Sequence, residues 1–199
     1  LGIINRDMFP VLCGAAKSGA GVTRLLEFLI NACPSPAPVH PTKAANGTEF
    51  HNSTEEAPAM FFFKISNEQN VGDVAMARIY GGTIAESQDL VNPRTCNKER
   101  ISQLLVSNGK TRERVEKACA GDIVSTIKLK DVRVNDSLVD AKISETAFEG
   151  VPFPAPIFST AIKAVNSQED EKLGGILADF HKIDPTVITS MSRELKQNI

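Results

Sequence analysis

The chain has 199 residues, 42% of them apolar and 23% charged, which is the composition of a soluble globular protein with a real core. Its net charge of -2 excludes a non-specific polyanion binder, because such binders accumulate Lys and Arg contacts to phosphates, so any nucleic-acid contact has to be local. No run approaches the roughly 18 consecutive apolar residues of a membrane span, and the opening ten residues lack a targeting pattern. We therefore expect a cytoplasmic protein with no membrane contact.

The first predicted unit is a strand, a Gly-rich turn and a helix. The apolar run at 9–14 indicates a short buried strand. Apolar residues at helical spacing follow the turn: Val22, Leu25, Leu26, Leu29, Ile30 and Cys33. Pro34 and Pro36 end that helix.

The turn itself, Gly14 to Gly21, invites comparison with the phosphate-binding pattern GxxxxGK[ST]. Ala20 and Gly21 stand where that pattern places its Lys and its hydroxyl residue, so both chemically active side chains are missing. The remaining interpretations are a tight turn into a helix and a contact with a nucleotide base.

A linker and a β-rich domain come next. The stretch 37–58 is rich in Pro, Ala, Thr, Asn and Glu without apolar periodicity, which predicts a linker. From 59 to 147, short runs of Val, Ile, Phe and Thr between turn residues predict a small all-β barrel or sandwich. The predicted turns are Asn70, Gly81-Gly82, Asn92-Pro93, Asn108-Gly109, Gly121-Asp122 and Asn135-Asp136.

The last part of the chain shows a third pattern. Prolines in 148–156 predict a second linker, and 157–164 is predicted to be a strand. A helix with Leu173, Ile176, Leu177 and Phe180 on one face follows. Ser167 is its candidate N-cap and Asp184-Pro185 its end.

Chemistry-bearing residues are scattered, except for one basic neighbourhood in the β-rich domain. It comprises Lys98, Arg100, Lys110, Arg112, Arg114 and Lys117, with Glu99, Glu113 and Glu116 interleaved. Mixed charge of this kind is typical of a solvated surface, and the sharper interpretation is an edge that faces RNA phosphates. The four cysteines form no CxxC pair and the three histidines share no metal-ligand spacing, so neither a zinc site nor a catalytic arrangement is indicated.

Short sequence motifs, in the same order across nearly the whole chain, resemble those of bacterial elongation factor G, a translational GTPase. The segment from Pro10 to Ala16, with Gly21-Val22, is similar to the family's last guanine-nucleotide motif. The second domain's signature is matched by Arg78 to Ile84, Lys98-Glu-Arg100, Arg112-Glu113 and Ala120 to Ile123, and the opening of the third by Phe153 to Ile157 and Asp184-Pro-Thr186.

The resemblance implies a mainly β fragment without the nucleotide-binding motifs. A small β-barrel, the translation-factor domain II, is flanked by a strand-helix remnant of an α/β GTPase domain and by the start of an α+β third domain. The implied boundaries are 1–36 for the end of the GTP-binding domain, 37–58 for a linker, 59–147 for the barrel, 148–156 for a second linker and 157–199 for the truncated third domain.

The resemblance also implies function. It predicts a monomeric factor that moves tRNA and mRNA through the ribosome with GTP, with domain II on small-subunit ribosomal RNA and proteins and an indirect contact to the tRNA–mRNA complex. Lys98, Arg100 and Arg112 are the implied RNA-facing residues. The intact parent would bind GTP or GDP with Mg²⁺ and hydrolyse GTP, whereas this fragment would carry no catalytic residue, no metal ligand and no bound nucleotide. Ala15, Ala16 and Lys17 would lie near the guanine base.

Departures from the family pattern suggest a divergent paralogue. Ala15 replaces a usual Ser, Gly81 another Ser, and Lys128 a common Gly. Asn135 also replaces a Gly, although Asn can adopt the left-handed turn. Two alternatives stay open, namely a ribosome-protection or regulatory GTPase of the same superfamily and an interaction module without a ribosomal function.

Overall fold

The computed structural model describes residues 2–5, 7–34, 41–68, 71–109, 111–164, 166, 170–192 and 197–198. The predictions for Asn70, Lys110, Ser167 and residues 37–40 concern positions outside these ranges. The chain forms two units, Leu1–Pro41 and Thr42–Ile199.

The first unit contains helix α1, Val22–Ala32, as the apolar spacing predicts. None of its residues is buried, and most of its apolar side chains are exposed, from 39% at Val22 to 80% at Ile30. The predicted strand at 9–14 is wrong, because these residues are irregular and exposed. A strand needs a neighbour for its backbone groups, and the described part of this unit offers only an isolated bridge between Ala15 and Ala20.

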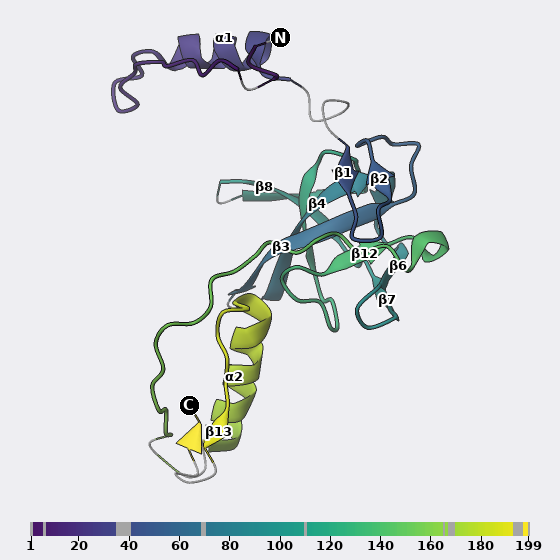
Figure 1. Cartoon of the computed structure of the whole chain (residues 1–199), viewed down its shortest axis with the longest axis vertical. Helices are drawn as coiled ribbons and strands as arrows, with labels where there is room; N and C mark the ends of the chain where they lie inside the picture. Colours follow the sequence, from purple (N-terminus) through teal and green to yellow (C-terminus); the bar gives the residue numbers. More distant parts are fainter. Residues whose placement is uncertain are drawn as a thin grey trace. The chain divides into compact units, whose positions relative to one another are not determined.

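The second unit is built mainly from short antiparallel strands (Figure 1). They are β1 (Thr42–Lys43), β2 (Glu49–Phe50), β3 (Ala59–Glu68), β4 (Gly72–Gly81), β5 (Thr83–Ala85), β6 (Asp89–Asn92), β7 (Asn97–Arg100), β8 (Leu104–Asn108), β9 (Thr111–Val115), β10 (Lys117–Cys119), β11 (Ile123–Ile127), β12 (Ser137–Val139), β13 (Met191–Ser192) and β14 (Gln197–Asn198), with the short 3-10 helix η1 (Ala141–Ile143) and helix α2 (Asp170–Ile183). The mainly β fold class is confirmed.

Eight of these strands form one antiparallel sheet in the order β7-β6-β12-β3-β4-β11-β8-β9, and β5 pairs with β10 beside it. Their inward side chains share a single core, which includes Phe62 of β3, Ile79 of β4, Leu90 of β6 and Leu104 of β8, all 0% exposed. Because one core collects side chains from strands at both ends of the sheet order, the sheet wraps around it as a small barrel.

Part of the stretch expected to be a linker is folded. Within 37–58, β1 and β2 pair as a hairpin, and Phe50 is only 3% exposed. Phe50 packs against Phe148 at 5.1 Å between ring centroids, and Tyr80 lies 4.7 Å from the same ring. Two-residue strands give no periodicity to detect, so this aromatic cluster on the outside of the barrel holds a hairpin that composition alone presents as a linker.

Gly81 and Gly82 leave room for the β1–β2 hairpin and the residues after it to lie close to the barrel. A Cβ on Gly81 would lie 2.7 Å from the Phe50 ring, so the departure from Ser leaves room for that ring. Gly82 has a φ of 70°, and a Cβ there would lie 2.7 Å from the carbonyl oxygen of Glu56. Both positions therefore require the absence of a side chain.

Two other departures occupy left-handed backbone. Asn135 has a φ of 76°, which confirms that Asn adopts the left-handed turn there. Lys128 has a φ of 62°, a conformation that costs a residue with a Cβ about 1–2 kcal/mol. A Gly would adopt this backbone conformation without that cost, so Lys128 is a strained residue.

The stretch after the barrel contains α2, which confirms the predicted helix and its end before Pro185. The predicted strand at 157–164 is wrong, because the described residues show only an isolated bridge at Ile162, and Ile157 is fully exposed. As at 9–14, the apolar run predicts a strand, but a strand also needs a neighbouring strand to pair with, and the described residues provide none there. Ile183 at the end of α2 packs against the barrel core.

Candidate functional site

Strand β7 presents two of the predicted RNA-facing residues on the outside of the barrel. Lys98 and Arg100 are exposed and stand two positions apart, so they share one face, while Glu99 between them points inward and is 2% exposed. Arg100 lies 3.7 Å from Asp89 of β6, which is a loose and solvated pair, and Lys98 has no ion-pair partner among the described residues. Lys98 is therefore open to a phosphate, and Arg100 can meet one by leaving its loose pair with Asp89.

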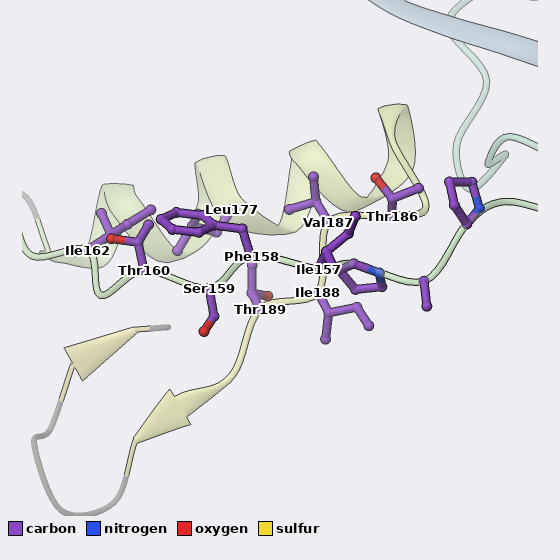
Figure 2. A pocket seen from close by; sticks show the side chains of 13 residues that line it. Ile157, Phe158, Ser159, Thr160, Ile162, Leu177, Thr186, Val187, Ile188 and Thr189 are labelled. Carbon is purple, nitrogen blue, oxygen red and sulfur yellow. The ribbon is translucent and has the colours of Figure 1, made fainter.

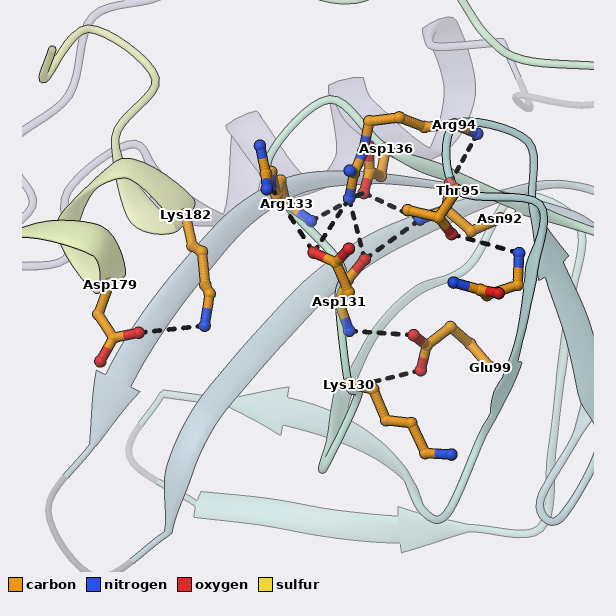
Figure 3. A network of polar contacts seen from close by, with 11 residues as sticks. Asn92, Arg94, Thr95, Glu99, Lys130, Asp131, Arg133, Asp136, Asp179 and Lys182 are labelled. Atoms are coloured by element: carbon orange, nitrogen blue, oxygen red, sulfur yellow. Dashed lines mark hydrogen bonds and ion pairs between the residues drawn. The ribbon is translucent and has the colours of Figure 1, made fainter. Parts of the chain in front are cut away.

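The buried carboxylate of Glu99 fixes the position of this strand. Its two oxygens accept hydrogen bonds from the backbone N–H groups of Lys130 at 2.9 Å and Asp131 at 3.0 Å (Figure 3). The hydroxyl of Ser102 donates to the Ile127 carbonyl oxygen at 2.8 Å just beyond. A buried carboxylate without such donors would be costly, so β7 and the 128–131 loop are held together.

A second buried carboxylate fixes the turn that precedes β7. Asp136, 6% exposed, accepts from Arg94 Nε at 2.8 Å, Asn92 Nδ2 at 3.0 Å and the Arg133 N–H at 2.9 Å (Figure 3). Hydrogen bonding to Asp136, helped by Asp131, raises the pKa of Arg94. The network thus ties the β6–β7 turn to the loop before β12 and gives Lys98 and Arg100 a rigid support.

The third predicted RNA-facing residue has a different setting. Arg112 lies on β9, at the opposite end of the sheet order from β7, and forms a two-pronged ion pair with Glu68 at the end of β3. The Arg112 guanidinium lowers the pKa of Glu68 mainly through this hydrogen bond, and the pKa of Arg112 is raised in turn. Of the three predicted RNA-facing residues, Lys98 has no ion-pair partner in the described part of the chain, Arg100 is loosely paired, and Arg112 is held by both oxygens of one carboxylate.

The turn predicted to lie near a guanine base forms a small pocket of about 380 Å³, whose lining includes Ala15, Ala16 and Gly21. The Ala15 N–H donates to Ala20 at 2.9 Å, whereas the Ala16 N–H has no partner among the described residues, and Lys17 is exposed. Gly21 has a φ of 80°, and a Cβ there would lie 2.6 Å from the Cys13 carbonyl oxygen. The turn can offer a backbone donor to a flat ring, but Ala20 and Gly21 supply neither the Lys nor the hydroxyl that a phosphate loop places at those positions.

An apolar groove of about 540 Å³ lies between α2 and the segments 154–162 and 186–189 (Figure 2). Its lining includes Phe158, Leu177, Val187 and Ile188. Its lining carries no ionisable group, so it offers no acid-base chemistry. Among the described residues no cluster of metal-ligating side chains occurs, and no helix there is long and apolar enough to cross a membrane.

Sequence reasoning missed Glu99 and Asp136, the two carboxylates that support β7. The sequence pattern assigns Glu99 to a mixed-charge surface and Asp136 to a turn, because the partners that bury them, Lys130 and Asp131 for Glu99 and Asn92 and Arg94 for Asp136, lie 31 to 44 positions away in the chain. The one signal present was an alternation in which Glu99 falls between two cations on a strand, so that it has to face the core when they face solvent.

Comparisons with known proteins assign a class to this barrel. The family model described as "Elongation factor G domain 2" matches residues 57–141. A crystal structure of a Thermus thermophilus protein superposes with a TM-score of 0.68 over 89% of this chain and 25% of that chain, at 24% identity, which shows the fold alone. The barrel is thus the second domain of a translation elongation factor.

Curated relatives identify the family. Elongation factor G of Ureaplasma parvum serovar 3 is 32% identical over 202 residues, covering 100% of this chain and 29% of its own length. That of Rhodopseudomonas palustris (strain BisB18) is 34% identical over 201 residues, covering 99% of this chain and 29% of its own length. The chain belongs to the elongation factor G family and spans 29% of the length of these relatives.

Proposed function

We propose that the chain is part of a ribosomal translocation factor whose barrel contacts small-subunit ribosomal RNA while GTP drives the movement of tRNA and mRNA. The observation that carries this proposal is the outward face of β7 in a barrel matched to elongation factor G domain 2. Lys98 and Arg100 stand there on a strand whose position two buried carboxylates fix. The proposed protein acts as a monomer in the cytoplasm.

The electrostatics suit a local RNA contact. With a net charge of -2, the chain as a whole repels a polyanion weakly, so binding depends on a few placed cations. Phosphate contacts of this kind fix the register of a protein on RNA without reading sequence. A preorganised strand loses little conformational entropy on contact, which makes two cations on β7 more effective than the same two on a mobile loop.

The nucleotide part of the proposal concerns the turn around Ala16. In the longer protein, GTP or GDP with Mg²⁺ would be held by residues outside this chain, since Ala20 and Gly21 supply neither the Lys nor the hydroxyl of a phosphate loop. Hydrolysis would be attack of water on the terminal phosphate, carried out by those other residues. Ala15, Ala16 and Lys17 would line the edge of the guanine base, with the free Ala16 N–H as donor.

Binding of the 199-residue chain to isolated small ribosomal subunits, measured by sedimentation at several salt concentrations, tests the RNA contact. The variant K98E/R100E should bind about tenfold more weakly, and the slope of log K against log salt should fall by about two because two phosphate contacts are lost. K142E/K163E reverses two exposed cations elsewhere and serves as the matched control. Equal binding by both double variants, at unchanged thermal stability, would remove β7 from the interface. No binding by the unmodified chain would favour an interaction module without a ribosomal function.

A further inference from the structure

The ion pair between Arg112 and Glu68 joins the tips of two hairpins. Arg112 is on the β8–β9 ribbon, which reaches outward from the barrel, and Glu68 is the last residue of β3 (Figure 1). The Arg112 Nη1 donates to Glu68 Oε2 at 2.7 Å and its Nη2 donates to Oε1. Both prongs of the guanidinium on that side are therefore occupied by one carboxylate.

The pair is open to exchange. The side chains of Arg112 and Glu68 are 32% and 34% exposed, so a second anion can approach the guanidinium from solvent. A phosphodiester of RNA offers the same two-oxygen edge and the same single negative charge as a carboxylate, and the planar fork of Arg binds both with the same geometry. An exposed pair of this kind contributes little net stability, so its loss is easily offset by a new partner.

We infer that Glu68 is an internal competitor of RNA phosphate for Arg112, so that Arg112 contacts RNA only by exchanging the carboxylate for a phosphate. This inference rests on the proposed RNA contact of the barrel and specifies how one of its cations is regulated. Lys98 and Arg100 are available at once, whereas Arg112 engages after the β8–β9 ribbon has been brought close to RNA. Glu68 is ionised at neutral pH, as glutamates ordinarily are, and the hydrogen bond from Arg112 lowers its pKa further.

Release of Glu68 leaves both hairpins intact. The β3–β4 tip is also closed by the Asn67 Nδ2 donating to Asp73 Oδ1 at 2.8 Å, and the β8–β9 ribbon is paired in register from Leu104 opposite Val115 to Asn108 opposite Thr111. The variant Glu68→Gln therefore removes the competing charge without removing the fold.

A matched control lies on the same ribbon. Glu113 is exposed and neighbours Arg112, but it shares its face with Val115, which packs against the core, so it points away from the Arg112 side. Among the described residues it has no ion-pair partner. Glu113→Gln changes the net charge by the same amount as Glu68→Gln and leaves the Arg112 pair in place.

The test compares binding of E68Q, E113Q, R112Q and E68Q/R112Q chains to isolated small ribosomal subunits over a range of salt concentrations. E68Q should bind about two- to fivefold more tightly than the unmodified chain, and its salt slope should steepen by about 0.7 to 0.9 for one added phosphate contact. E113Q should change binding by much less, and E68Q should have no advantage over E113Q once Arg112 is absent.

Two outcomes would overturn the inference in distinguishable ways. Equal effects of E68Q and E113Q on a chain that does bind would show that Arg112 is a structural residue, and the proposed function would stand on Lys98 and Arg100. Absence of binding by every variant, E68Q included, would overturn the proposed RNA contact and the competition together.

Discussion

The substitution Asp136→Asn probes the network that supports β7. The carboxylate is 6% exposed and accepts from Asn92, from both Nε and Nη2 of Arg94 and from the Arg133 N–H, at 2.8 to 3.0 Å. Asn keeps the shape but has one acceptor oxygen, and its amino group would face donors. The variant therefore loses an ion pair and sets donor groups against each other.

Breaking a buried charge pair by removing one partner costs about 3–5 kcal/mol, and the 37% exposure of Arg94 lets water replace part of the loss. We expect the free energy of unfolding to fall by about 2–3 kcal/mol. Urea unfolding followed by far-UV circular dichroism measures it, with Tyr80, the only Tyr in a chain without Trp, as a second probe. Asp140→Asn is the control, because Asn caps the short helix η1 as well as Asp does. A loss below about 1 kcal/mol for Asp136→Asn would show that the network does not support the barrel.

Two further predictions follow from the backbone and from the ion pairs. Lys128→Gly should raise the free energy of unfolding by up to about 1 kcal/mol, because it relieves a left-handed residue. Lys130→Gly, two positions further along the chain, is the control and should lower the free energy of unfolding. Equal effects of the two substitutions would show that the backbone at Lys128 is not strained. In an NMR titration the Glu68 carboxyl should have a pKa below its ordinary 4.5, and Arg112→Gln should return it towards that value. The pair's contribution is thus complete above pH 4.5 and is lost as the pH falls through the lowered pKa; an unchanged Glu68 titration in Arg112→Gln would contradict this.

The elements with a clear period could be predicted from the sequence. Helices α1 and α2 follow from apolar residues at helical spacing, and turns such as Asn108-Gly109 and Asn135-Asp136 mark the barrel strands. Both helices keep the apolar spacing although no described residue of α1 or α2 is buried, whereas the barrel strands bury one face. It fails for 9–14 and 157–164, where an apolar run has no paired strand in the described chain, and for β1 and β2, which are too short to show a period.

The candidate site was likewise predictable only in part. Exposure of Lys98 and Arg100 follows from alternation along β7, since the residue between them has to face the core. The partners of Glu99 and Asp136 are set by loops that come together only in the folded barrel, so no local pattern reveals them. The pairing of Arg112 with Glu68 likewise joins two hairpin tips that are 44 positions apart.

The central claim, that the β7 face of the barrel lies on small-subunit RNA, can be tested most directly from Cys96. This exposed residue sits in the turn just before β7, two positions from Lys98. A chain with Cys96 as its only cysteine, carrying a tethered iron chelate, should cut small-subunit RNA at a few defined sites through locally generated radicals. A chain with only Cys33, which is exposed in the other unit, should not reproduce those cuts. Identical cleavage from both positions, or none from Cys96 in a chain that binds, would contradict the account.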